Sequence, residues 1–106
     1  MKRNQLVLER EFSKIRKLYA NQPNLDFEPY YKALKDSIHQ LGNLQLISIS
    51  CIPCIINQDD TFYWEFTFKG TPTMDIFKAF TWLNDDDIIP QLKWKDQETF
   101  MLYFTI

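Results

Sequence analysis

Residues 62–69 alternate between two kinds of side chain more regularly than any other part of the chain. Large aromatic side chains occupy every second position: Phe62, Trp64, Phe66 and Phe68. The positions between them carry polar or hydroxyl-bearing side chains: Tyr63, Glu65, Thr67 and Lys69. Because successive side chains of a strand point to opposite faces, this period of two predicts a strand with one buried face. A slip of one residue would move four aromatic rings into water, so the register is strongly specified.

Three further segments are expected to complete the sheet. Residues 44–56 are rich in β-branched side chains, and Ile47, Ile49 and Cys51 alternate with serines. A polar turn at 57–60 joins this strand to 62–69, which predicts an antiparallel hairpin. Residues 92–94 and 100–106 alternate in the same way around a turn at 95–98. We therefore expect a sheet of two hairpins.

Three segments have the periodicity of helices. Residues 4–20 place Leu8, Phe12, Ile15 and Tyr19 on one side, and Arg3, Arg10, Lys14 and Lys17 on the other. A second helix is expected to start at Asp26, a good N-cap, and to end at Gly42-Asn43. Thr71-Pro72 is expected to open a third helix, ending at Asn84, with Ile76, Phe77, Phe80 and Leu83 on its buried side.

The resulting order is ααββαββ, which predicts an α+β fold: a four-stranded, mainly antiparallel sheet with helices packed on its apolar face. A chain of 106 residues, 45% of them hydrophobic, is expected to form a single domain with one core. The N-terminal apolar run is too short for a signal peptide, and no apolar stretch is long enough to span a membrane. With two cysteines and no export signal, we expect a cytoplasmic protein.

Charge is distributed unevenly along the chain. Residues 1–20 carry six basic and two acidic side chains, whereas the rest of the chain carries six basic and twelve acidic ones. The basic side of the first helix raises the possibility of nucleic-acid binding. The formal net charge of −2 and the absence of a recognised binding module argue against it.

The sequence offers few residues arranged as a conventional active site. Cys51 and Cys54 have the spacing of a redox motif, but no helix follows them, and on a strand the two thiols would point to opposite faces. We expect Cys51 in the core and Pro53 at the end of the strand or in a bulge. The single histidine, His39, falls on the polar side of its helix without an orienting partner. We therefore predict neither an enzyme nor a bound cofactor or metal ion.

The third helix suggests a binding surface instead. Trp82 falls off its buried side by the helical count, and Asp85, Asp86 and Asp87 follow directly. An exposed aromatic beside a block of negative charge is typical of a protein-binding surface. Asp59 and Asp60 form a second, smaller acidic corner. These six residues are the candidate partner-binding site, although turn residues that only aid solubility have the same composition.

Two functional hypotheses follow. The first is a small inhibitor that covers a basic surface on another protein, for example a nuclease, as bacterial immunity proteins against toxins or phage inhibitors of host defence do. The second is a small-ligand-binding domain or enzyme with a pocket between sheet and helices. Its polar contacts would come from tyrosines: Tyr30, Tyr31, Tyr63 and Tyr103.

Overall fold

The computed structural model describes residues 3–22, 26–56 and 59–106. Four strands and four helical segments follow one another in the predicted order. In chain order these are α1 (Arg3–Leu18), α2 (Glu28–His39), β1 (Gln45–Ile56), β2 (Asp59–Lys69), α3 (Met74–Ala79), the 3₁₀ helix η1 (Thr81–Asp86), β3 (Gln91–Trp94) and β4 (Thr99–Thr105). The α+β fold class and the element order are confirmed. None of the described helices combines the length and apolar character that crossing a membrane requires.

The four strands form one antiparallel sheet in the order β1-β2-β4-β3. Each predicted hairpin forms, and pairing of β2 with β4 joins the two. The aromatic face of β2 is the centre of the core, because Trp64, Phe66 and Phe68 are fully buried. Phe66 stacks against the ring of Phe104 on β4, with their centroids 5.8 Å apart. The prediction for β2 is therefore confirmed: the segment is a strand, and its aromatic face is the buried one.

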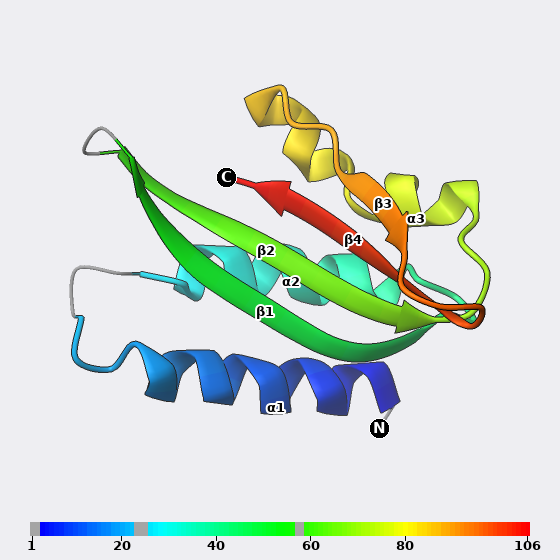
Figure 1. Ribbon diagram of the computed structural model, residues 1–106, viewed down its shortest axis with the longest axis horizontal. Coiled ribbons are helices and arrows are strands. Elements are labelled where there is room, and N and C mark those ends of the chain that lie inside the picture. Colours follow the sequence, from blue (N-terminus) through cyan, green and yellow to red (C-terminus); the bar gives the residue numbers. More distant parts are fainter. Residues whose placement is uncertain (1–2, 23–25, 57–58) are drawn as a thin grey trace.

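Helices cover one face of this sheet and leave the other open. Figure 1 shows α2 behind the strands, α1 along the outer side of β1, and α3 with η1 beyond β3. The open face carries the alternate positions of each strand, among them Ile52, Tyr63, Glu65, Met101 and Tyr103. Most of these side chains are partly exposed, and Ile52 is 51% exposed.

The free edge of β1 is bonded to side chains of α1. The Asn4 side-chain amide donates to the carbonyl of Leu44 at 2.8 Å and accepts from the amide of Leu46 at 2.9 Å. These two bonds are the pair that a neighbouring strand would supply. Arg10 and Tyr19 donate to two further carbonyl groups of β1, at 3.3 and 2.9 Å. Helix α1 therefore protects an edge that could otherwise pair with another chain.

Two details of β1 differ from the prediction. A bulge lies between Leu46 and Ser48, so Leu46 is fully buried and the intervening Ile47 is only partly buried. Pro53 neither ends nor bulges the strand but pairs with Phe62. It is tolerated because β1 is an edge strand, where a missing N–H removes no ladder hydrogen bond.

The helix boundaries also differ. Helix α2 starts at Glu28 rather than at Asp26, although the Asp26 carboxylate does accept a hydrogen bond from the Glu28 amide at 3.1 Å. It ends at His39, before Gly42, whose φ is +64°. The predicted Thr71-Pro72 start of the third helix is wrong, because α3 begins at Met74.

The predicted third helix is in fact two short pieces. Helix α3 ends at Ala79, Phe80 has a φ of −113°, and η1 begins at Thr81. A 3₁₀ helix turns by about 120° per residue rather than about 100°, so the helical count fails beyond Phe80. Phe80 and Leu83 are still buried, but Trp82 points elsewhere than predicted.

Candidate functional site

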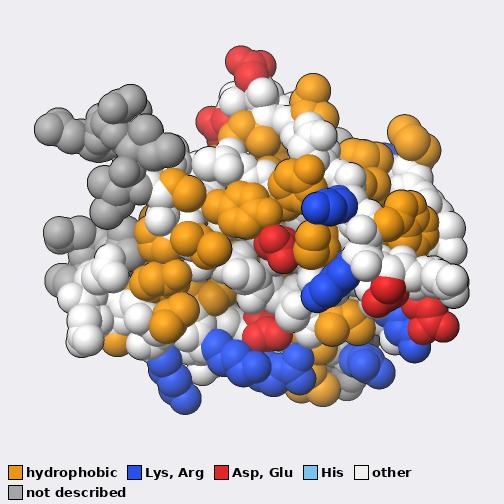
Figure 2. All heavy atoms as spheres, viewed as in Figure 1, with side chains coloured by type: hydrophobic (Ala, Val, Ile, Leu, Met, Phe, Trp, Pro, Cys, Tyr) orange, Lys and Arg blue, Asp and Glu red, His pale blue; other side chains and the backbone are white. Residues whose placement is uncertain are grey.

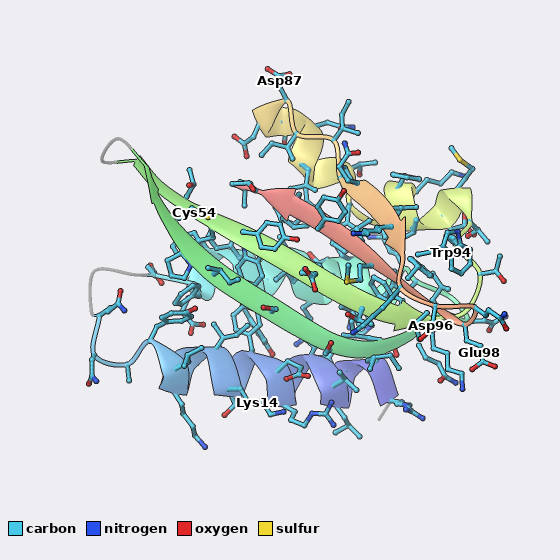
Figure 3. The ribbon with its side chains drawn as sticks, in the orientation of Figure 1. Lys14, Cys54, Asp87, Trp94, Asp96 and Glu98 are labelled. Atoms are coloured by element: carbon cyan, nitrogen blue, oxygen red, sulfur yellow. The ribbon has the colours of Figure 1, made fainter. Side chains whose placement is uncertain are left out.

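Asp85, Asp86 and Asp87, here called the acidic segment, lie at the end of η1 and are all exposed. No Lys, Arg or His of the described residues has a nitrogen within 4.0 Å of their carboxylates. Figure 3 shows Asp87 projecting from the tip of η1. Three like charges therefore sit together on the surface without compensation from the described part of the molecule.

The backbone holds the acidic segment in a defined turn. Asp87 has a φ of +56°, a left-handed conformation that Asp adopts more readily than most residues. The amide of Ile88 donates to the carbonyl of Leu83 at 3.0 Å, which closes the turn. The next residue, Ile89, is 72% exposed. An exposed apolar side chain thus lies two positions from the last aspartate.

Trp82 is not the exposed aromatic that the helical count predicted. It is half-buried, and its ring meets Phe104 edge-on with the centroids 6.0 Å apart. Its indole N–H donates to the hydroxyl of Ser37, a fully buried residue of α2, at 2.8 Å. Trp82 therefore attaches η1 to α2 and has no free indole donor for a partner.

A different aromatic residue lies near the acidic segment. Tyr30 of α2 is half-buried, and its ring centroid is 5.7 Å from that of Phe62. Burial raises the pKa of Tyr30, and the negative charge of Asp86 raises it further. The sequence did not associate Tyr30 with the acidic segment, because the packing of η1 against α2 has no local pattern. Ile89 follows two residues after Asp87, so the sequence shows its proximity but not its exposure.

Asp59 and Asp60 belong to β2 rather than to a turn. Their backbones pair with those of Ile56 and Ile55. Their side chains, and the predicted turn residues 57 and 58, lie outside the described part of the structure. The second acidic corner therefore stays a prediction.

The thiols occupy the positions expected of two residues three apart on a strand. Cys51 is buried opposite Trp64, and Cys54 lies opposite Thr61 on the other face. Burial raises the pKa of Cys51 to about 12, which keeps it protonated and unreactive at neutral pH. His39 is exposed at the end of α2. Within the described residues, no three His, Cys, Asp or Glu side chains are grouped as metal ligands.

The second hypothesis needs space between the sheet and the helices. Among the described side chains that space holds the aromatic core, for example Phe12 stacked on Trp64 with centroids 5.9 Å apart. A hollow of about 370 Å³ lies elsewhere, at the surface between the start of α1 and the loop after α2.

The basic side of α1 is exposed, as predicted. Arg10 and Lys14 each lie within 4.0 Å of the largely buried Glu11 carboxylate, at 3.6 and 3.5 Å, so part of this charge is compensated within the helix. Tyr63 has a neighbour on the open face, Tyr103, with centroids 6.3 Å apart.

Comparison of the chain with models of known protein families, with curated proteins and with solved structures gave no match. The chemistry of the exposed surfaces is therefore the guide to function.

Proposed function

We propose that this protein binds another protein through the acidic segment and inhibits it by covering a basic surface. The observation that carries the proposal is a run of three exposed carboxylates with no described cation within 4.0 Å. Such carboxylates can pair with a partner's cations without first breaking internal ion pairs. Nucleases must present positive charge to their substrates, so a nuclease toxin is the class of partner that fits best. The role would be that of an immunity protein.

Neighbouring apolar groups support the same surface. Ile89 is 72% exposed and has apolar area to bury against a partner. Tyr30 is only partly exposed; burial raises the pKa of its phenol, and the negative charge of Asp86 contributes to the same rise. Carboxylates speed encounter and set register, whereas buried apolar contacts supply most of the affinity.

The contacts that hold η1 in place also suit a binding surface. The hydrogen bond from Trp82 to Ser37 and the buried side chain of Leu83 fix η1 to the rest of the molecule. A surface that is already ordered loses little conformational entropy when it binds.

The test compares the protein with the triple variant D85N/D86N/D87N. Each Asn keeps the shape of the Asp and removes its charge, and Asn also tolerates the positive φ of position 87. Both proteins are immobilised and exposed to proteins of the organism that encodes the chain, and captured proteins are quantified by mass spectrometry. Each captured protein is then purified and assayed with and without the inhibitor. We expect a basic protein whose activity is inhibited, and whose association with the variant is at least about tenfold slower at low salt.

A matched control carries D36N/D75N/E98Q, which removes three exposed carboxylates from other parts of the surface. The control should bind like the unmodified protein. Equal loss in both variants would mean that only net charge matters, and unchanged binding by D85N/D86N/D87N would place the interface elsewhere. Either result would overturn the proposal, provided that thermal midpoints show all three proteins folded.

A further inference from the structure

The hollow of about 370 Å³ lies where the first turn of α1 meets the loop that follows α2. Figure 1 shows these two segments at the same end of the molecule. The floor of the hollow is apolar, because the buried residues Ile38 and Leu44 line it. Exposed residues form its rim: Arg3, His39, Gly42 and Asn43. Sites for small molecules commonly have this volume and combine an apolar wall with a few polar groups.

Hydrogen bonds hold the two walls of the hollow together. The Asn4 side chain, on the α1 side, donates to the carbonyl of Leu44 and accepts from the amide of Leu46. In the loop, Gly42 has a φ of +64°, and a Cβ at this position would meet no atom within 4 Å, so the space beside it is open. The hollow is therefore formed before a ligand arrives, which lowers the entropic cost of binding.

One buried polar atom at the hollow has no partner. Gln5 also lines the hollow and is 9% exposed, and its side-chain oxygen Oε1 accepts no hydrogen bond from the described residues. The other end of the same amide, Nε2, donates to the Glu9 carboxylate at 3.0 Å. An ionised carboxylate only accepts, so Glu9 fixes which end of the amide faces it. Because Glu9 does not line the hollow, the acceptor Oε1 is the end turned away from Glu9. A donor on a ligand would satisfy it.

The charges around the hollow favour an anion. Its described lining includes Arg3 and His39 but no Asp or Glu. No described carboxylate lies within 4.0 Å of the Arg3 guanidinium. Helix α1 begins at Arg3, so the positive end of its dipole lies at the same place. Figure 2 shows Lys and Arg side chains gathered along the lower edge of the molecule, where Figure 1 places α1. This field attracts small anions toward the hollow.

We propose that the hollow binds a small organic anion that carries hydroxyl groups, the chemistry shared by sugar phosphates and sugar acids. The anionic group lies at the rim between Arg3 and His39, where the guanidinium fork matches a phosphate or a carboxylate. A hydroxyl group donates to Oε1 of Gln5, and the carbon frame covers Ile38 and Leu44. Because the Arg3 side chain is exposed, it can move aside to admit the ligand to the buried oxygen and then close over the anion.

This binding does not rest on the proposed function. The acidic segment lies at the end of η1, whereas the hollow lies at the start of α1. The variant D85N/D86N/D87N should therefore bind small anions in the hollow as the unmodified chain does. The two proposals succeed or fail separately.

NMR titration of isotope-labelled protein tests the site with four probes. Glucose 6-phosphate and gluconate each combine hydroxyl groups with an anionic group, whereas inorganic phosphate and glucose each supply one of these features. We expect at least one combined probe to bind at least about tenfold more tightly than inorganic phosphate and than glucose. Preference for glucose 6-phosphate would identify a phosphate site, and preference for gluconate a carboxylate site. The amide signals of Gln5, His39, Gly42 and Asn43 should move on binding.

Two variants separate the two halves of the ligand. Arg3→Gln removes the guanidinium charge and should weaken the binding of both the combined probe and inorganic phosphate. Gln5→Met keeps the length of the side chain and removes the acceptor. It should weaken the combined probe at least about tenfold and leave inorganic phosphate unchanged. Lys17→Gln is the matched control and should change neither, because Lys17 is an exposed basic residue of α1 that does not line the hollow.

Equal binding of all four probes, or binding of none, would overturn the proposal and leave the hollow to water. Signals that move at Lys14 and Lys17 instead would indicate a general attraction of anions to the basic side of α1, and would also overturn it. So would a Gln5→Met protein that is folded, as its thermal midpoint shows, and binds the combined probe unchanged. Arg3→Gln alters an exposed residue, so unchanged binding in that variant decides against the site even where Gln5→Met does not fold.

Discussion

The hydroxyl of Ser37 accepts the indole N–H of Trp82 at 2.8 Å and itself donates to the carbonyl of Ala33 at 3.1 Å. This one buried hydroxyl therefore connects η1 to the backbone of α2, across 45 residues of sequence. It explains why a tryptophan beside a charged turn is half-buried and has its indole donor occupied.

Ser37→Ala should destabilise the fold by about 1–3 kcal/mol, because it leaves the indole N–H without its acceptor in a partly buried place. For a domain of this size, each 1 kcal/mol corresponds to a fall of about 4–8 °C in the thermal midpoint. Chemical denaturation measures the change, and Ser50→Ala, at an exposed position on the open face, is the control. In a double-mutant cycle with Trp82→Phe the two losses should not add, and additive losses would show that the hydrogen bond contributes nothing.

Asn4→Ala should expose the edge of β1. The substitution removes both the donor to Leu44 and the acceptor for the Leu46 amide, so we expect a loss of about 1–2 kcal/mol in stability. The Leu46 amide should also exchange its hydrogen faster, which NMR detects at a single residue. Asn21→Ala, in the exposed turn after α1, should change neither quantity. An unchanged exchange rate at Leu46 in Asn4→Ala would show that other contacts protect this edge.

The two thiols should differ in reactivity. Cys54 is partly exposed, whereas Cys51 is buried and burial raises its pKa to about 12. A thiol reagent at mildly alkaline pH should therefore modify one cysteine per native molecule and two after denaturation. Cys54→Ser should abolish the native reaction and leave one site in denaturant. Rapid modification of Cys51 in the native state would contradict the packing around it.

Tyr63 should make stability fall at high pH. Burial, and to a lesser extent the hydrogen bond to Glu65 at 2.9 Å, raises the pKa of Tyr63 to about 12. The folded state therefore holds this proton more tightly than the unfolded state, in which the pKa is about 10. Its contribution is complete below about pH 10 and is lost as the pH rises toward 12. Tyr63→Phe should flatten the fall in unfolding free energy over this range, and an unchanged slope would assign it to another group.

Glu65→Gln provides a second check on the same phenol. It removes the carboxylate and its charge but keeps the burial of Tyr63. The phenolate absorbance of the native protein should then appear at a lower pH than in the unmodified chain. No shift would mean that burial alone sets the pKa.

The success of the sequence-based predictions follows from how strongly each pattern limits the structure. In β2 the period of two leaves one choice of buried face, and Trp64 and Phe66 are buried as predicted. Beyond Phe80 the prediction failed, because Lys78-Ala79-Phe80 contains neither Gly nor Pro and so gives no sign of the change to a 3₁₀ helix. As a result, Trp82 was predicted to be exposed, whereas it is half-buried.

The acidic segment was easier to predict than its surroundings. Three consecutive aspartates are rarely buried, so their exposure needs no knowledge of the fold. Their association with Tyr30 depends on how η1 meets α2, which is a long-range contact without a local pattern. The partly exposed apolar groups on the open face could have been recognised from the sequence, because Met101 and Tyr103 interrupt the polar side of β4.

Helix α1 precedes β1 in the chain, and this order matters during synthesis. The segment that bonds to the free edge of β1 leaves the ribosome before the strand does. The strand can therefore meet Asn4 as soon as it emerges, ahead of its own hairpin partner β2, so that only the edge that β2 later occupies is left open to pairing with a neighbouring nascent chain.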